Sequence, residues 1–227
     1  MFRLGLSLKR IRRIPSSDDC SVTSRSLFRS SARRERRAVG IDDGPSTLSS
    51  ERTKPRHGFA SLIAVWFAGL AIDDMRIGVA QVDGVDTTDV ILRLMSKRRA
   101  DVVFLSGVSY AGFNIVDAGR LHRVLRVPVI IISRERPNNP SVRRALKKHF
   151  ADWKMRWDLV RRLGGIHSYS PTSVDAPLYF EAIGISDIDA KKTIQTYCIT
   201  SRVPEPIRVA GIVAKGLALT GNELRTR

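Results

Sequence analysis

Carboxylate side chains follow two apolar segments of the chain, where they could hold a divalent cation. Asp42 and Asp43 come directly after the first apolar run and precede a Gly-Pro turn, and Asp83 and Asp86 follow a later one. Carboxylates at strand ends can bind Mg²⁺ or Mn²⁺, and phosphodiester hydrolysis needs several of them from different elements. We therefore take Asp42, Asp43 and Asp86 as candidate catalytic residues, and Asp42, Asp86 and Asp83 as candidate metal ligands.

Both acidic groups also have a purely structural interpretation. Asp-Asp-Gly-Pro is good turn chemistry with or without a metal. Asp86 could instead cap the helix that is expected to follow it, which would contribute about 1 kcal/mol. The sequence leaves these alternatives open.

A glycine-punctuated segment at 106–113 follows another apolar run. Its glycines would let backbone approach a phosphate, and Tyr110 or Phe113 could stack on a base. Asn114 closes the segment. The alternative is a tight connection that places one aromatic ring in the core. We take Tyr110, Phe113 and Asn114 as candidate nucleic-acid contacts.

Basic residues dominate the composition, with 39 Lys and Arg against 22 acidic residues and a net charge of +17. Such a surface attracts polyanions, with nucleic acid, DNA or RNA, as the expected partner and an anionic membrane or ribosome next. Arg134, Arg202 and Arg208 are candidate phosphate contacts. The alternative is a solvated surface with a basic tail. The sequence does not indicate an oligomeric state.

Hydrophobic periodicity predicts three leading strands and then alternating helices and strands. Three leading strands favour an antiparallel meander, and the β-α-β units that follow favour parallel additions to its edge. The expected fold is α/β, a ribonuclease H-like mixed sheet flanked by helices. The expected strands are 38–41, 58–67, 71–82, 101–105, 128–132 and 178–183, and the expected helices are 87–97, 114–125, 141–150, 153–163, 187–199 and 206–219.

The composition also predicts how the chain is divided. Residues 1–36 are rich in Ser and Arg without a sustained period, which predicts a disordered basic tail. Residues 37–221 are expected to form the domain, and 222–227 a second tail. Two isolated cysteines indicate a reducing, cytoplasmic location. The longest apolar run, 58–72, is too short to span a bilayer, so no transmembrane segment is expected and no membrane is taken as the partner over nucleic acid.

Four segments carry a resemblance to a known family, and together they extend over about residues 37–221. They are Gly40-Ile41-Asp42-Asp43-Gly44-Pro45, Val82-Asp83-Gly84-Val85-Asp86, Gly107 with 110–117, and Pro204-Glu205-Pro206-Ile207-Arg208. They look like the endonuclease V-like archaeal family called domain of unknown function 99. Endonuclease V is a ribonuclease H-like enzyme that cuts near deaminated adenine with Mg²⁺. The resemblance implies that Asp42 is a metal ligand, together with Asp86 or, as the weaker match, Asp83.

The chain departs from this pattern at two places. Ser106 stands where the family and endonuclease V usually have a metal-ligating Asp, and Gly211 stands where the family usually has His. A serine hydroxyl is a weak, neutral Mg²⁺ ligand, and losing a ligand weakens metal binding. We therefore expect a nucleic-acid-binding protein with a degenerate nuclease site.

Two other functions remain open at this point. One is an active Mg²⁺-dependent endonuclease that hydrolyses phosphodiester bonds with Asp42, Asp43 and Asp86. The other is a non-catalytic protein-interaction module that uses the basic helices expected at 141–150 and 153–163.

Overall fold

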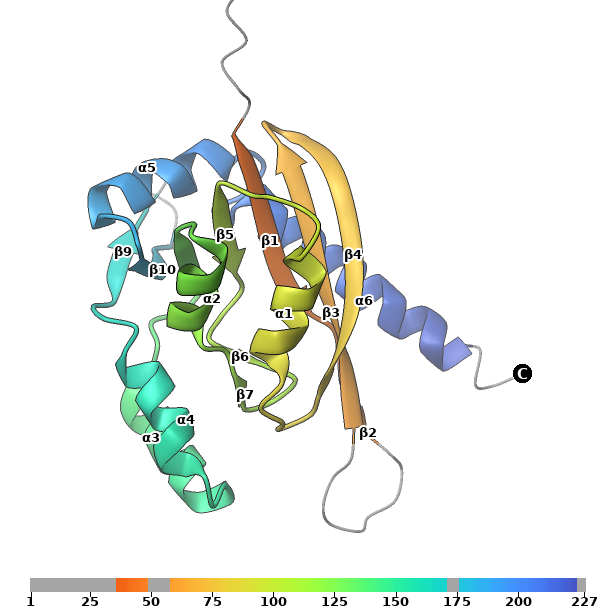
Figure 1. Ribbon diagram of the computed structural model, residues 1–227, viewed down its shortest axis with the longest axis vertical. Coiled ribbons are helices and arrows are strands. Elements are labelled where there is room, and N and C mark those ends of the chain that lie inside the picture. The colour runs from red at the N-terminus through yellow and green to blue at the C-terminus, as the bar shows by residue number, and fades with distance from the viewer. Residues whose placement is uncertain (1–35, 49–57, 171–175, 224–227) are drawn as a thin grey trace, which may run out of the picture. The chain divides into compact units, whose positions relative to one another are not determined.

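A mixed sheet of eight strands lies at the centre of the computed structural model, which describes residues 36–48, 58–170 and 176–223 (Figure 1). The predicted tail, residues 1–36, therefore lies outside the described residues except for Arg36. The strand order is β2-β3-β1-β5-β8-β10-β9, and β4 pairs with the other edge of β3. The strands are β1 (Arg37–Asp43), β2 (Thr47–Leu48), β3 (Gly58–Ala68), β4 (Ala71–Gln81), β5 (Val102–Leu105), β8 (Val129–Ser133), β9 (His167–Tyr169) and β10 (Leu178–Ile183).

The expected combination of antiparallel and parallel pairing is confirmed. β1, β3 and β4 form an antiparallel meander, while β5 and β8 add to β1 in parallel. The register pairs Ile41 with Leu105 and Leu105 with Ile131. Three parallel strands therefore end at the same edge of the sheet, where a ligand site is expected in such folds.

Helices cover both faces of the sheet and bury two hydrophobic clusters. α1 and α2 pack on one face, whereas α5 and α6 pack on the other (Figure 1). α3 and α4 form a helical hairpin that projects beyond the sheet (Figure 1). The helices are α1 (Thr87–Met95), α2 (Ala118–Leu125), α3 (Asn139–His149), α4 (Trp153–Arg161), α5 (Asp187–Tyr197) and α6 (Glu205–Glu223). α6 thus extends two residues into the segment 222–227, which was expected to be a tail.

Gly40 explains how closely α6 approaches β1. A Cβ atom at this position would overlap the backbone of Pro206 and Ile207, at the start of α6. Backbone cannot move aside as a flexible side chain can, so a residue without Cβ is required here. This contact places the first turns of α6 directly behind the end of β1.

The glycine-punctuated segment contains a small hairpin that periodicity did not predict. β6 (Ser109–Tyr110) pairs with β7 (Asn114–Ile115), so the following helix begins at Ala118 rather than at 114. The Asp117 carboxylate accepts a hydrogen bond from the Arg120 N–H at 2.7 Å and caps the helix there. Two-residue strands are too short to show a period, which is why the sequence pattern missed them.

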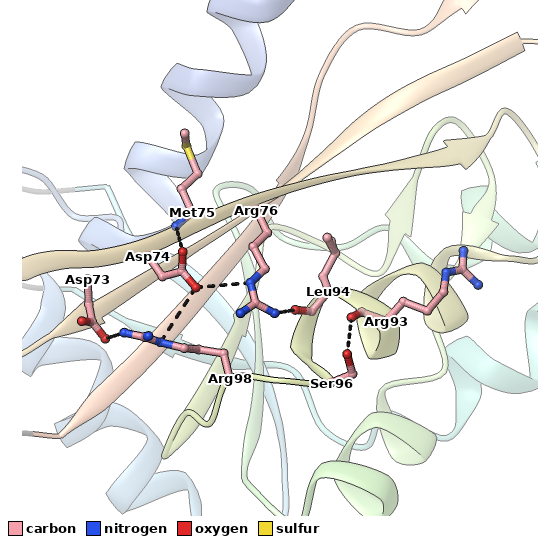
Figure 2. A network of polar contacts seen from close by, with 8 residues as sticks. All are labelled: Asp73, Asp74, Met75, Arg76, Arg93, Leu94, Ser96 and Arg98. Atoms are coloured by element: carbon pink, nitrogen blue, oxygen red, sulfur yellow. Dashed lines mark hydrogen bonds and ion pairs between the residues drawn. The ribbon is translucent and has the colours of Figure 1, made fainter.

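A network of charged side chains fastens the outer strand β4 to the end of α1 (Figure 2). Arg76 donates to the Leu94 carbonyl at 2.7 Å and pairs with Asp74 at 3.2 Å. Arg98 pairs with Asp73 on the same strand. The Leu94 carbonyl lies in the last turn of α1, so Arg76 supplies a donor that this helix end lacks.

In the described part of the chain, no helix is long and apolar enough to cross a membrane.

Candidate functional site

Asp42 lies at the end of β1 and faces the cleft beneath α6. Its Oδ1 accepts a hydrogen bond from the Asp43 N–H at 3.0 Å, and the Ser106 side chain lies close enough to the same carboxylate to stabilise its charged form. Burial raises the pKa of Asp42, and these contacts together with Arg134 and Lys215 limit the rise. Asp42 is therefore a partly desolvated carboxylate with a neutral hydroxyl and two cations nearby.

A cleft of about 530 Å³ opens beside Asp42. It lies between the ends of β1, β5 and β8 and the first three turns of α6. Its apolar lining includes Ile132, Val203 and Ile207. Its charged lining consists of three acidic and three basic side chains, namely Asp42, Asp43, Glu135, Arg134, Arg208 and Lys215. A cleft with apolar walls and mixed charges suits a ligand that carries both a phosphate and an apolar ring.

Asp43 serves a different set of contacts from those of its neighbour. Its Oδ2 accepts a hydrogen bond from the Ala111 N–H at 2.6 Å, in the turn between β6 and β7. Burial raises its pKa, and the adjacent charge of Asp42 raises it further. Successive strand residues point to opposite faces, so Asp43 fastens the β6–β7 hairpin while Asp42 faces α6.

Tyr110 is buried, where its hydroxyl bonds the backbone at the ends of β1 and β5, and its ring is not available to stack on a base. Its side chain is 1% exposed, and its hydroxyl donates to the Ile41 carbonyl at 3.3 Å. The hydroxyl also accepts from the Ser106 N–H at 3.1 Å. The structure therefore does not present the Tyr110 ring for stacking, and the alternative of one aromatic ring in the core describes it.

Asp83 and Asp86 lie outside the lining of the cleft. The Asp86 carboxylate accepts from the Asn114 side chain at 2.7 Å and from the Gln81 N–H at 3.2 Å. Asp83 accepts from the Phe113 N–H at 2.9 Å. Both carboxylates thus connect the β4–α1 loop to the β6–β7 hairpin. Asp86 also precedes α1 at its N-cap position, but its side chain makes no capping hydrogen bond.

The two other predicted contacts of this segment are also engaged in structural interactions. Asn114 is fully buried and bonds to the Thr87 N–H and the Asp86 carboxylate. Phe113 is half-buried and packs edge-to-face on Phe150, with 5.5 Å between ring centroids. The structure therefore does not bring either side chain to the cleft.

The three predicted arginines divide between the cleft and the scaffold. Arg134 and Arg208 line the cleft, although Arg208 also pairs with Glu205 at 2.6 Å. Arg202 instead donates to the carbonyls of Ala176 and Pro177 at 3.0 and 2.9 Å. Its contacts hold the segment that leads into β10.

Sequence reasoning missed two charged residues of the cleft, Glu135 and Lys215, and it named Gly211 only as a departure from the family pattern. A Cβ atom at Gly211 would lie 2.5 Å from the Asp42 Oδ2, so the absence of a side chain leaves room for the carboxylate. A glycine in the middle of a helix is unfavourable by about 1 kcal/mol, and that local cost was the available signal. Glu135 and Lys215 carried no signal because charged surface residues are common.

Among the described residues, the acidic side chains do not assemble a two-metal centre. Across the part of the chain that the structure describes, no group of three or more His, Cys, Asp and Glu residues is arranged to hold a metal ion. Asp42 supplies one carboxylate, Ser106 a neutral hydroxyl, and one oxygen of Asp43 is already bonded. This donor set fits a single weakly held cation that takes most of its ligands from water and phosphate.

Solved structures with a similar fold include nucleases and a protein of unknown function. A protein of unknown function from Archaeoglobus fulgidus DSM 4304 matches with a TM-score of 0.68 and 22% identity, over 80% of this chain and 98% of that one. Endonuclease V of Bacillus subtilis matches with a TM-score of 0.54 and 11% identity, over 84% and 83% of the two chains. Endonuclease V of Ciona intestinalis, in complex with inosine-containing DNA, matches with a TM-score of 0.52 and 15% identity, over 84% of this chain and 86% of that one. The ribonuclease H-like fold is therefore confirmed.

Curated relatives share more of the sequence. The UPF0215 protein of Methanothermobacter thermautotrophicus is 35% identical over 189 residues, which cover 82% of this chain and 89% of that protein. The UPF0215 protein of Pyrococcus furiosus is 35% identical over 192 residues, covering 82% and 93%. Residues 34–218 match the family model of endonuclease dU. The resemblance to an endonuclease V-like archaeal family is confirmed, and the chain belongs to the endonuclease dU family.

Proposed function

We propose that this protein binds a nucleic-acid strand in the cleft beside Asp42, and that its divalent-cation site is weaker than that of an active nuclease. The observation that carries the proposal is the pairing of Asp42 with the neutral Ser106 hydroxyl. A second carboxylate at that position would double the negative charge offered to a cation. A hydroxyl offers none, and Coulomb attraction to Mg²⁺ falls accordingly.

Three independent features support a nucleic-acid ligand. The net charge of +17 attracts polyanions. Arg134 and Lys215 line the cleft and act on the Asp42 carboxylate, so they also lie where a bound phosphate would be stabilised. The family is named for an endonuclease, and endonuclease V of Ciona intestinalis was solved with DNA bound.

Each cleft residue has a defined part in such binding. Arg134 and Lys215 neutralise phosphate charge, while Ile132 and Ile207 exclude water from one side of the strand. Asp43 holds the β6–β7 hairpin against the end of β1 through Ala111. A cation held at Asp42 would neutralise charge on the phosphate and polarise its phosphorus–oxygen bonds.

An active Mg²⁺-dependent endonuclease is the second candidate, and Glu135 favours it. Glu135 is a third carboxylate in the lining of the cleft, and it is exposed just beyond the end of β8. An exposed side chain can reorient toward a cation that Asp42 already holds. The pair Asp42 and Glu135 would then supply the two carboxylates that Mg²⁺ commonly uses with substrate phosphate.

A binding and cleavage experiment separates the two candidates. Labelled single-stranded and duplex DNA and RNA, with deoxyuridine, inosine or ordinary bases, are mixed with the protein in Mg²⁺, Mn²⁺ or EDTA. The family's name makes deoxyuridine-containing DNA the first substrate to test. Fluorescence anisotropy measures binding, and denaturing gels measure cleavage. Asp42→Asn removes the cleft carboxylate, and Asp83→Asn removes the same charge outside the cleft.

The weakened-site proposal expects metal-independent binding and little cleavage in either cation. It also expects Asp42→Asn to tighten binding in EDTA, because the variant removes a negative charge that faces the phosphate. Asp83→Asn should leave binding as in the wild type. Efficient cleavage that needs Mg²⁺ and disappears in Asp42→Asn, but not in Asp83→Asn, would overturn the proposal in favour of the active enzyme.

A further inference from the structure

The helical hairpin of α3 and α4 carries a concentrated positive charge. Between Asn139 and Arg162 there are eight Lys and Arg residues against two Asp residues. α3 follows directly on the loop after β8 that holds Arg134. The hairpin therefore leaves the sheet at the edge where β1, β5 and β8 end, and it projects away from the sheet (Figure 1).

Two cation–aromatic pairs form successive rungs across the hairpin. The Arg143 guanidinium lies 5.9 Å from the ring centre of Trp157, and the Lys147 ammonium lies 5.9 Å from that of Trp153. The two cations are four residues apart on α3 and the two indoles four apart on α4, so both rungs share one face. Lys154 adds a third cation, 6.0 Å from the Trp153 ring.

Among the residues that the structure describes, the cations on this face have no acidic counterparts. Asp152 pairs with Arg156, and Asp158 pairs with Arg161 and Arg162. Within the described ranges, Arg143, Lys147 and Lys154 form no ion pair, and all three are exposed. Their contacts with the indole rings restrict the side chains, which lowers the entropic cost of binding a phosphate.

Arg156 fixes the hairpin relative to the cleft. This buried guanidinium donates to the carbonyls of Gly84 and Phe113 at 2.8 and 2.7 Å, and to that of Asp83 at 2.9 Å. The β6–β7 hairpin that contains Phe113 is also the one that Asp43 holds through Ala111. The β6–β7 turn therefore contacts Asp43 of the cleft through Ala111 and Arg156 of the α3–α4 hairpin through Phe113.

We propose that Arg143, Lys147 and Lys154 bind phosphates of a nucleic-acid strand that continues outward from the cleft. The inference rests on the proposed function and adds a second contact site to it. A nucleic-acid ligand is favoured over an acidic protein because α3 follows the loop that carries Arg134, a residue of the cleft lining, and because the charges on this face are regularly spaced. Two adjacent rungs on a helix suit the repeating charge of a phosphodiester backbone.

The test compares two variants of equal charge in the full-length protein. Arg143→Gln/Lys147→Gln removes two of the three unpaired cations, and the control Arg161→Gln/Arg162→Gln removes two cations that both pair with Asp158. Binding is measured over a range of salt with a single strand of roughly 5 nucleotides and one of roughly 25, bracketing the span of a single binding site. For the long strand, the slope of log K against log salt should be less negative in the first variant than in the wild type by about 1.4, since each lost phosphate contact removes about 0.7 from its magnitude. The short strand should bind both variants as it binds the wild type.

Tryptophan fluorescence supplies a direct second measurement. The chain has three tryptophans, of which Trp66 is fully buried, so changes on binding report on Trp153 and Trp157. The long strand should change the emission of the wild type and of the control variant. The short strand should not change it, because it is held in the cleft.

Each outcome bears on a different statement. If the wild type binds neither strand, the proposed function fails and this inference falls with it. If the wild type binds the long strand and the two variants have the same salt slope, the inference is overturned and the proposed function stands. Competition by polyglutamate as effective as that by DNA of equal charge would identify an acidic peptide as the ligand and would also overturn it.

Discussion

Ser106→Asp places a second carboxylate beside Asp42, at the position where the resemblance to endonuclease V implies one. In the wild type Ser106 adjoins Asp42 in the lining of the cleft, so we take the new carboxylate to lie roughly 4 Å from the existing one. Two charges at about that distance repel by about 4 kcal/mol at an effective dielectric constant of about 20. Arg134 and Lys215 offset part of this repulsion. We expect the metal-free variant to lose about 2 to 3 kcal/mol of stability, which lowers Tm by about 5 to 10 °C in a chain of this size.

A divalent cation should reverse this loss, because it neutralises both carboxylates at once. At a concentration about 100 times its dissociation constant, Mg²⁺ or Mn²⁺ would stabilise the variant by about 2.7 kcal/mol. The assay is thermal unfolding at about pH 8, where both carboxylates are ionised in the unfolded chain, with metal or with EDTA. Isothermal titration with Mn²⁺ then measures the affinity without any need for nuclease activity.

Two controls separate the site from a general charge effect. Ser109→Asp adds the same charge at an exposed position of β6 and should show no metal-dependent Tm. Asp42→Asn combined with Ser106→Asp should lose the metal dependence. The reasoning would be refuted if Ser106→Asp bound Mn²⁺ no more tightly than the wild type, or if the wild type already bound it strongly through Asp42.

Three further predictions concern the scaffold, two of them with a control substitution. Arg156→Ala should reduce the free energy of unfolding by about 3 kcal/mol or more in urea denaturation, because it leaves Asp152 and three carbonyls unpaired. As a control, Arg161→Ala removes an exposed side chain and should change this free energy by less than about 0.5 kcal/mol. Equal effects of the two substitutions would contradict the role of Arg156. Burial raises the pKa of Glu181 from 4.5 to about 7, so the folded state holds its proton more tightly than the unfolded chain. The stability that this group contributes is therefore full below pH 4.5 and falls as the pH rises to about 7. The free energy of unfolding of Glu181→Gln should exceed that of the wild type by at most about 3 kcal/mol at about pH 8, and by nothing at about pH 4. A difference that does not depend on pH would refute this. Gly40→Ala should destabilise the protein by about 3 kcal/mol, because the new Cβ would meet the backbone of α6. Gly216→Ala, at an open position on that helix, should stabilise it by about 0.5 to 1 kcal/mol. Thermal unfolding of both variants measures this difference.

Much of the fold could be read from local patterns in the sequence. The apolar run before Asp42 and the turn after Asp43 place a strand end there, and the structure ends β1 at Asp43. The order of strands and helices predicted the antiparallel meander and its parallel additions. These features are local because strand and helix periods extend over a few residues and glycine or proline marks their ends.

The part played by each acidic residue could not be read in this way. Asp42, Asp83 and Asp86 look alike in the sequence, since each follows an apolar segment. In the structure, Asp42 faces the cleft, while Asp86 bonds Asn114, which lies 28 residues away, and Asp83 bonds Phe113, 30 residues away. The chemistry of a carboxylate depends on which distant donors reach it, and that is decided when the segments pack.

By itself, then, the sequence determined a ribonuclease H-like sheet, the strand end that carries Asp42 and Asp43, and the serine at 106 beside them. The tertiary structure alone decided that Tyr110 and Asn114 are buried supports and that Glu135 and Lys215 belong to the cleft. It also brought Arg143 and Lys147 over two tryptophans of the next helix. The physical reason is the range of the interactions: hydrophobic periodicity and turn preferences act between neighbours in the chain, whereas burial and charge pairing act between neighbours in space.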